Sequence, residues 1–330
     1  MLKHFSLLLL VVICFSIPAH ADSYNNQEGA FSYFVSETGA VLTDWNGREI
    51  DEATSILVLP SFLGGSPLVG IGKNALSTVS FDGDLTKLEI IVPEGVTYLE
   101  KDAFEDCCHA TAIQLPSTLR DIPEGCFFHV TAEISFPNGN VYFSCEDGFL
   151  VDISTSTLLY SSPSSYNNAL PDIKRIGESS IDNWAYEKKD FFLPQTITSI
   201  GTMVFYDLPD LESLSLPSGV TEIDSHCFSC TGLMYVELPS SLKIIPPYCF
   251  TNCSLKSIHF PEGIMHISEF AFYQNWENIE TITLPASVQF VGYQAFPEET
   301  QIITLNAHTH FETREEYDQR FQSSELKQLN

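Results

Sequence analysis

A short apolar segment that ends in proline recurs along the chain. Successive prolines in this setting are 33, 23, 21, 34, 23, 23, 22, 22 and 24 residues apart. Each follows directly on an apolar residue, at Pro60, Pro93, Pro116, Pro137, Pro171, Pro194, Pro217, Pro239, Pro261 and Pro285. Apolar and polar residues alternate before most of them, which predicts a strand with one buried face, and proline is tolerated at a strand end. The spacing therefore predicts a stack of similar units, two of which carry inserts.

The unit that ends at Phe228 shows the full pattern. Leu214 and Leu216 alternate before the proline, and Val220 and Ile223 follow it three and six residues later. A small residue and Phe228 then complete the unit. Apolar residues thus surround the whole unit, so a single unit cannot bury them, whereas stacked units form a continuous core. The pattern predicts a repeat solenoid built mostly from β-strands.

The first 21 residues predict a signal peptide. Lys3 gives a positive start, residues 5–17 are rich in apolar side chains, and Ala19 and Ala21 occupy the positions before a cleavage site. About 13 residues span about 20 Å as a helix, less than the roughly 30 Å of a bilayer core, so a membrane anchor is the less favoured interpretation. We expect an exported protein that is secreted, periplasmic or on the cell surface, and not an integral membrane protein.

Composition narrows the classes of partner. The chain has 330 residues with 43 acidic and 15 basic side chains, a formal net charge of −28, and 44% hydrophobic residues. The apolar content is sufficient for a large core and excludes global disorder. Nucleic-acid binding requires clustered basic residues that neutralise phosphates, so the acidic balance argues against a nucleic-acid partner.

The repeat pattern L-x-L-P-x-x-hydrophobic-x-x-I-x-x-x-A-F resembles that of the BspA-like leucine-rich repeat proteins. The resemblance covers residues 31–307. Residues 59–72 resemble the family's opening unit with its glycine-bearing insert, and residues 144–163 resemble its hairpin-bearing long unit. The resemblance implies a horseshoe-shaped solenoid with a parallel β-sheet on the concave face and short strands or 3₁₀ turns opposite.

These observations divide the chain into four parts. We expect a signal peptide at 1–21, a linker and β cap at 22–58, about ten repeat units at 59–305, and a C-terminal cap or tail at 306–330. Both ends of a solenoid need a cap. Thr313 and Glu316 have the spacing of a capping box, and Tyr317 and Phe321 are one helical turn apart. Residues 312–328 are therefore predicted to form a helix.

The cysteines leave two interpretations open. Eight of the nine remain after Cys14 leaves with the signal peptide. Cys227 occupies the small-residue position of its repeat, which favours a buried structural thiol over a redox or zinc pair with Cys230. Cys230 and Cys253 both follow the repeat phenylalanine, where the resembled family often carries a cysteine. Stacked turns about 4.8 Å apart would allow a disulfide between them, with free thiols as the alternative.

Candidate chemistry is otherwise sparse. His308, His310 and Glu312 could suggest a metal site, but their place near the end of the chain favours ordinary surface histidines. The sequence contains no G-x-S-x-G, H-E-x-x-H, phosphate-binding loop or dinucleotide fingerprint. We therefore expect a protein that is not an enzyme and that has no metal and no cofactor.

The strand pattern predicts which side chains face outward. Residues two and four before the proline point away from the core. The candidate binding row on the concave face is accordingly Gln114, Phe192, Ser215, Tyr235, Glu237, His259 and Thr283. Aromatic residues on a polar face suit binding anchors, although ordinary solvated strand positions are the alternative.

The function hypotheses follow from this surface. The first is a non-catalytic exported adhesion protein that binds a protein of the host or of a neighbouring cell, as the family resemblance implies. The alternative is an extracellular glycan-binding protein, in which the aromatic side chains would stack on sugars. A hydrolase is least favoured, because no nucleophile and base can be named.

Overall fold

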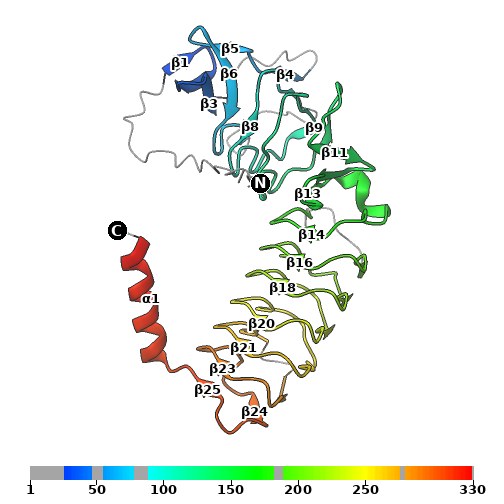
Figure 1. The fold of residues 1–330 in the computed structure, drawn as a ribbon, viewed down its shortest axis with the longest axis vertical. Helices are drawn as coiled ribbons and strands as arrows, with labels where there is room; N and C mark the ends of the chain where they lie inside the picture. The colour runs from blue at the N-terminus through cyan, green and yellow to red at the C-terminus, as the bar shows by residue number, and fades with distance from the viewer. Residues whose placement is uncertain (1–25, 47–54, 78–87, 182–188, 276–278, 329–330) are drawn as a thin grey trace, which may run out of the picture.

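The computed structural model describes residues 26–46, 55–77, 88–181, 189–275 and 279–328. The predicted signal peptide lies outside these residues. The chain forms a curved stack of turns that starts from a β-rich N-terminal part, and a helix returns beside the stack from its far end (Figure 1). The prediction of a leucine-rich repeat solenoid is confirmed.

The N-terminal part begins with antiparallel strands. The three strands are β1 (Asn26–Glu28), β2 (Phe31–Val35) and β3 (Ala40–Trp45). Strand β3 then pairs in parallel with β6 (Ser66–Ile71), which forms a hairpin with β5 (Phe62–Leu63) and pairs with β8 (Tyr98–Leu99). The antiparallel strands cover the first turn, so the apolar side chains of Phe31, Tyr33 and Trp45 are buried.

The strands that precede the repeat prolines, together with one strand in the turn after the last of them, make up a first ladder, which consists of three parallel sheets in the described residues. Every pair between consecutive turns is parallel. Its members in chain order are β4 (Ile56–Val58), β7 (Leu88–Ile91), β9 (Ala110–Gln114), β10 (Glu133–Ser135), β15 (Asp190–Phe192), β17 (Ser213–Ser215), β19 (Tyr235–Glu237), β22 (Thr281–Leu284) and β24 (Gln301–Thr304).

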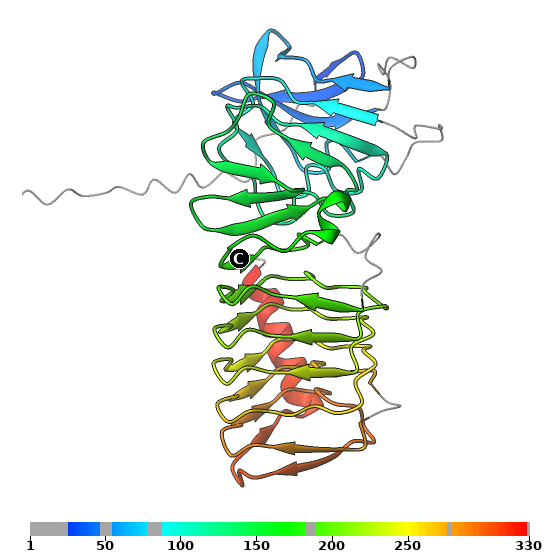
Figure 2. The same ribbon diagram turned by 90° about the vertical axis from the view of Figure 1, so that its right-hand side faces the viewer.

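A second ladder of two-residue strands follows six residues after the prolines. These strands also pair in parallel between consecutive turns, except between the third and the fourth of them, and nearly every one buries its second residue. They are β14 (Arg175–Ile176), β16 (Ser199–Ile200), β18 (Glu222–Ile223), β20 (Ile244–Ile245), β21 (His266–Ile267), β23 (Phe290–Val291) and β25 (His310–Phe311). Figure 2 shows the regular stacking of the turns in the C-terminal half.

The longer of the two inserted units forms a hairpin-bearing segment between the two halves of the stack. Its antiparallel strands are β11 (Phe143–Glu146), β12 (Phe149–Asp152) and β13 (Thr157–Ser161), followed by a 3₁₀ helix at Pro163–Asn167. Strand β13 then pairs in parallel with β14. Phe149 and Leu158 belong to the C-terminal core, whereas Leu150 and Tyr160 belong to the N-terminal core. This segment is therefore the seam between two hydrophobic cores.

A column of phenylalanine rings fills the C-terminal core. Neighbouring rings lie nearly parallel, with centroid distances of 5.4 Å for Phe205–Phe228, 5.1 Å for Phe228–Phe250 and 5.2 Å for both Phe250–Phe272 and Phe272–Phe296. The residue two positions before each ring has a positive φ between 48° and 57°, at Met203, His226, Tyr248, Phe270 and Gln294. The same tight turn therefore places each ring directly above the previous one.

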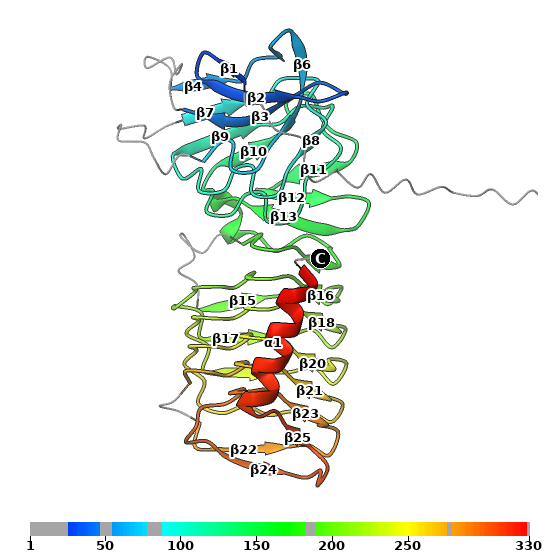
Figure 3. The ribbon, with the colours of Figure 1, turned by 90° about the vertical axis from the view of Figure 1, so that its left-hand side faces the viewer.

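The C-terminal helix α1 spans Arg314–Gln328 and starts with the predicted capping box. The Thr313 N–H and hydroxyl donate to the Glu316 carboxylate at 2.8 and 2.9 Å, and the Glu316 N–H donates back to the Thr313 hydroxyl at 3.3 Å. Figure 3 shows α1 running along the stack from β25 toward β16. The predicted helix over 312–328 is thus confirmed, apart from its first two residues.

Candidate functional site

The structure brings four of the seven predicted binding residues into one row of the first ladder. Phe192, Ser215 and Glu237 are register partners in β15, β17 and β19, and an isolated bridge joins Glu237 to His259. Tyr235 lies beside this row, in register with Ser213. Phe192 is 86% exposed and Tyr235 is 54% exposed, so both aromatic side chains face solvent.

The other two predicted residues lie in separate sheets. Gln114 belongs to the sheet of β4, β7, β9 and β10, before the hairpin-bearing segment, and its amide donates to Glu89. Thr283 belongs to β22, whose partner is β24, and its register partner is Ile303. The contiguous part of the predicted row is therefore the patch of Phe192, Ser215, Tyr235, Glu237 and His259, which we call the first-ladder patch.

The first-ladder patch does not face the side toward which the stack bends. In Figure 1 the second-ladder strands β14 to β25 lie on the side of α1, and β4, β9 and β24 lie on the other side. The parallel sheet on the concave side is thus the second ladder, and the expectation of a concave first-ladder row is wrong. The alternation of apolar and polar residues identifies side chains that point away from the core. The direction in which the stack curves depends instead on how closely the turns pack at each ladder.

The inner side of the stack carries a ladder of half-buried rings that the sequence reasoning missed. His226 stacks on Tyr248 with a centroid distance of 4.7 Å, and Tyr248 stacks on Phe270 at 5.0 Å. Tyr293 continues the ladder edge-on to Phe270 at 5.8 Å. An available signal was the aromatic residue two positions before the repeat phenylalanine in three consecutive units. We call these four residues the inner aromatic ladder.

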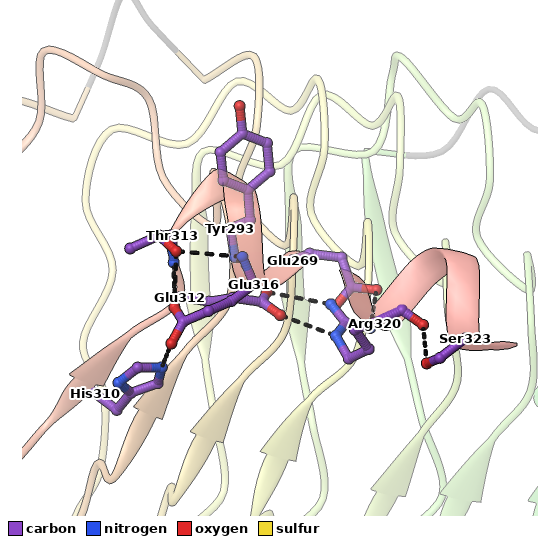
Figure 4. A network of polar contacts seen from close by, with 8 residues as sticks. All are labelled: Glu269, Tyr293, His310, Glu312, Thr313, Glu316, Arg320 and Ser323. Atoms are coloured by element: carbon purple, nitrogen blue, oxygen red, sulfur yellow. Dashed lines mark hydrogen bonds and ion pairs between the residues drawn. The ribbon is translucent and has the colours of Figure 1, made fainter. Parts of the chain in front are cut away.

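Helix α1 docks on this ladder through an arginine and two carboxylates (Figure 4). The Arg320 guanidinium donates to both oxygens of Glu312 at 2.9 and 3.1 Å and forms an ion pair with Glu269 at 3.1 Å. The Glu312 side chain is only 4% exposed, and it also accepts from the Tyr293 N–H at 2.9 Å. Burial would raise the pKa of Glu312, but the hydrogen bonds from Arg320 and Tyr293 outweigh it and hold the pKa below its ordinary value.

The ring of Tyr317, in α1, packs against the same ladder. Its ring stacks on Tyr293 at 5.2 Å and meets the edge of Phe270 at 5.7 Å. Arg320 in turn lies over the Tyr317 ring at 5.3 Å. Aromatic pairs of this geometry add to the free energy gained by burying their surface. Phe270 and Tyr293 therefore contact both α1 and their neighbours in the inner aromatic ladder.

We expect Arg320→Ala to loosen α1. The change removes the guanidinium that pairs with the nearly buried Glu312, so cleavage of α1 by a glutamate-specific protease should become roughly tenfold faster. Gln319→Ala is the matched control, because the exposed Gln319 amide bonds only to Glu315 of the same helix in the described contacts. Equal cleavage rates for the two variants would contradict the docking role of Arg320.

The inner aromatic ladder also predicts a pH dependence. Burial lowers the pKa of His226 below its ordinary value of 6.5, so the unfolded chain binds this proton more readily than the folded protein. The melting temperature should therefore fall as the pH drops from about 7 to about 5. His226→Phe keeps a ring in the ladder without this titration, and its melting temperature should fall less. If the melting temperatures of the two proteins fall equally as the pH drops, His226 is not the group that causes this pH dependence.

Of the two interpretations left open for Cys230 and Cys253, the structure has the free thiols and not the disulfide. Cys230 follows its repeat phenylalanine by two residues and Cys253 by three, so they occupy different positions of the turn. The Cys253 thiol donates to the Phe228 carbonyl at 3.0 Å, and the Asn252 amide faces Cys230 at 3.5 Å. In the next turn Asn275 occupies the position of Cys253, and its amide donates in the same way to the carbonyl of Phe250 at 2.7 Å.

Of the two histidines near the end of the chain, His310 contacts helix α1, whereas the His308 N–H donates to the side chain of Asn306. His310 lies in β25, and its ring faces Glu316 at 3.4 Å, while Glu312 is engaged by Arg320. Within the described residues, no group of three His, Cys, Asp or Glu side chains is placed to hold a metal ion. Nor does that part of the chain contain a helix long and apolar enough to cross a membrane.

Comparison with known proteins agrees with this architecture. A family model for the BspA type leucine rich repeat region matches in six copies over residues 71–149, 152–275 and 221–330. No curated protein matches the sequence. A leucine-rich repeat protein from Eubacterium ventriosum is similar in structure, with 17% identity, a TM-score of 0.54 and coverage of 85% of this chain and 95% of that one.

Two further solved structures are more distant in shape. A leucine rich cell surface protein from Faecalibacterium prausnitzii has 16% identity, a TM-score of 0.42 and coverage of 91% of this chain and 97% of that one. A leucine-rich repeat protein from Bacteroides ovatus has 21% identity, a TM-score of 0.43 and coverage of 87% and 69%. The family model spans most of the solenoid and the C-terminal helix. The chain therefore belongs to the BspA-type leucine-rich repeat family.

Proposed function

We propose that this chain is an exported, non-catalytic adhesion protein that binds a protein partner through the first-ladder patch. The observation that carries the proposal is the pair of exposed aromatic side chains, Phe192 and Tyr235, on a regular polar sheet. Exposed aromatic residues commonly supply the dominant contacts of protein interfaces. Export is supported by the signal-peptide pattern of residues 1–21.

The scaffold supports such a role because the patch is already ordered. Leu214 and Val236 alternate with the patch residues and are buried in the core, so the outward side chains sit on fixed backbone. A preformed surface loses little conformational entropy when it binds. The net charge of −28 favours a partner with a basic surface, since complementary charge accelerates association.

A partner captured from extracellular proteins would test the proposal. We expect the double variant Phe192→Ser and Tyr235→Ala to weaken binding of that partner at least roughly tenfold. Glu222→Ala is the control, because Glu222 is an exposed residue of the second ladder. If only the Glu222 variant loses affinity, binding does not use the first-ladder patch.

Glycan binding is the second candidate, and the 86% exposure of Phe192 favours it. An open ring beside the hydroxyls of Ser213 and Ser215 could stack on a sugar, and these residues lie in register with β15. A glycan array probed with the purified protein distinguishes the two candidates. Binding to glycans that Phe192→Ser abolishes would favour the second candidate over the first.

A further inference from the structure

A cleft of about 470 Å³ lies on the inner side of the stack, at the seam between the two cores. Thr157 of β13, Arg175 of β14 and Ser199 of β16 line it, together with Glu124 from the turn before the hairpin-bearing segment. The cleft is separate from both the first-ladder patch and the docking contacts of Arg320 and Tyr317. Its volume falls in the range of small-molecule sites, about 300–1,000 Å³.

The charged groups of the cleft are held in place before any ligand arrives. The Arg175 guanidinium donates to both carboxylate oxygens of Glu124, at 2.7 and 3.1 Å, and to Asp224 at 3.0 Å. It also donates to the Ser199 hydroxyl at 3.3 Å. Glu124 accepts a further hydrogen bond from the Glu178 N–H at 2.9 Å. Side chains fixed by their neighbours provide the preorganised hydrogen-bonding groups that a small polar ligand requires.

The lining of the cleft contains equal numbers of basic and acidic side chains, and it has both polar and apolar surface. Lys174 and Arg175 are matched by Glu124 and Asp152, and hydroxyl groups come from several threonine and serine residues. Ile122 and Leu159 supply an apolar floor, with exposures of 6% and 4%. An anionic ligand would meet two carboxylates, and a cationic one would meet two basic groups. A neutral ligand rich in hydroxyl groups, with one apolar face, suits this lining best.

We propose that this cleft binds a neutral saccharide. Its hydroxyl groups would bond to Arg175, Lys174 and Thr198, and the apolar face of one sugar ring would lie on Ile122 and Leu159. This site does not depend on the function proposed for the first-ladder patch, because it lies on the other side of the stack. A protein partner and a saccharide could therefore be bound at the same time.

The test uses the purified protein and four probes: methyl glucoside, methyl galactoside, methyl mannoside and N-acetylglucosamine. Titration calorimetry and saturation-transfer NMR should show binding of at least one of them, with a dissociation constant of about 1 mM for a ligand of this size. Lys174→Met and Thr198→Val should each weaken this binding about fivefold or more. Both changed residues are exposed, so the variants should fold normally.

Thr221→Val provides a matched control. The Thr221 hydroxyl donates to the Thr198 carbonyl at 3.3 Å, as the Thr198 hydroxyl donates to the Lys174 carbonyl at 3.3 Å, but Thr221 does not line the cleft. Equal weakening by both threonine variants would overturn the proposal. So would a folded protein that binds none of the four probes, or displacement of the saccharide by an equal concentration of sulfate, which would indicate an anion site. First-ladder variants should leave saccharide affinity unchanged.

Discussion

Phe228→Ala should lower the free energy of unfolding by about 3–5 kcal/mol, the usual cost of removing a buried phenylalanine. The Phe228 ring is fully buried and lies between Phe205 and Phe250, at 5.4 and 5.1 Å. The change would leave a cavity between two rings that the turns hold apart. Because each turn of a solenoid is stabilised mainly by its neighbours, the loss should extend to adjacent turns.

Denaturant unfolding followed by circular dichroism would measure this effect, and hydrogen exchange would locate it. Phe192→Ala is the matched control, because that ring is 86% exposed and its removal should change stability by no more than about 0.5 kcal/mol. If both variants lose a similar free energy of unfolding, the phenylalanine column does not stabilise the core as expected. Leu216→Ala, at the buried residue directly after β17 in the same turn, should resemble Phe228→Ala.

Arg175→Met should cost about 2 kcal/mol, between the values for buried and exposed ion pairs. The guanidinium bridges Glu124, in the N-terminal half of the stack, and Asp224, in the C-terminal half. Burial alone would raise the pKa of Glu124, but hydrogen bonds from Arg175 and from the Glu178 N–H keep it below its ordinary value. The variant would leave both half-buried carboxylates without this cation, so the two cores should be joined less firmly.

Thermal unfolding monitored by calorimetry would show this weakening as a lower or broader transition. Lys189→Met is the control, because the Lys189–Glu212 pair is solvent-exposed and lies within one half of the stack. That control should leave the melting curve unchanged. An unaltered transition in Arg175→Met would show that the seam is held by its apolar contacts alone.

The repeat unit could be predicted from sequence because its positions are set by burial. Leu214, Val220 and Phe228 recur at constant spacing, and each must face the core for the turns to stack. The capping box at Thr313 is equally local, since it involves only residues three apart. The first-ladder patch was predicted for the same reason, as its members alternate with core residues.

Features that depend on relations between turns were harder to predict. A disulfide between Cys230 and Cys253 was one of two open interpretations, and it overlooked that the two thiols differ by one position within their turns. The Arg175 guanidinium joins Glu124 and Asp224, which are 51 and 49 residues away in the chain. The docking of Arg320 on Glu269 is likewise a contact over 51 residues. The spacing of the repeat does not indicate which residues of distant turns pair with one another.

The return of α1 along the stack has a practical consequence for measuring distances in this molecule. Because the helix runs back from β25, the last described residues lie level with the middle of the stack and not beyond its final turn (Figure 3). A fluorescent dye coupled there would lie level with β16 but apart from the stack, whereas a dye in β24 would mark the far end. Energy transfer between these two dyes would change when α1 detaches, so it would measure the detachment of the helix from the stack.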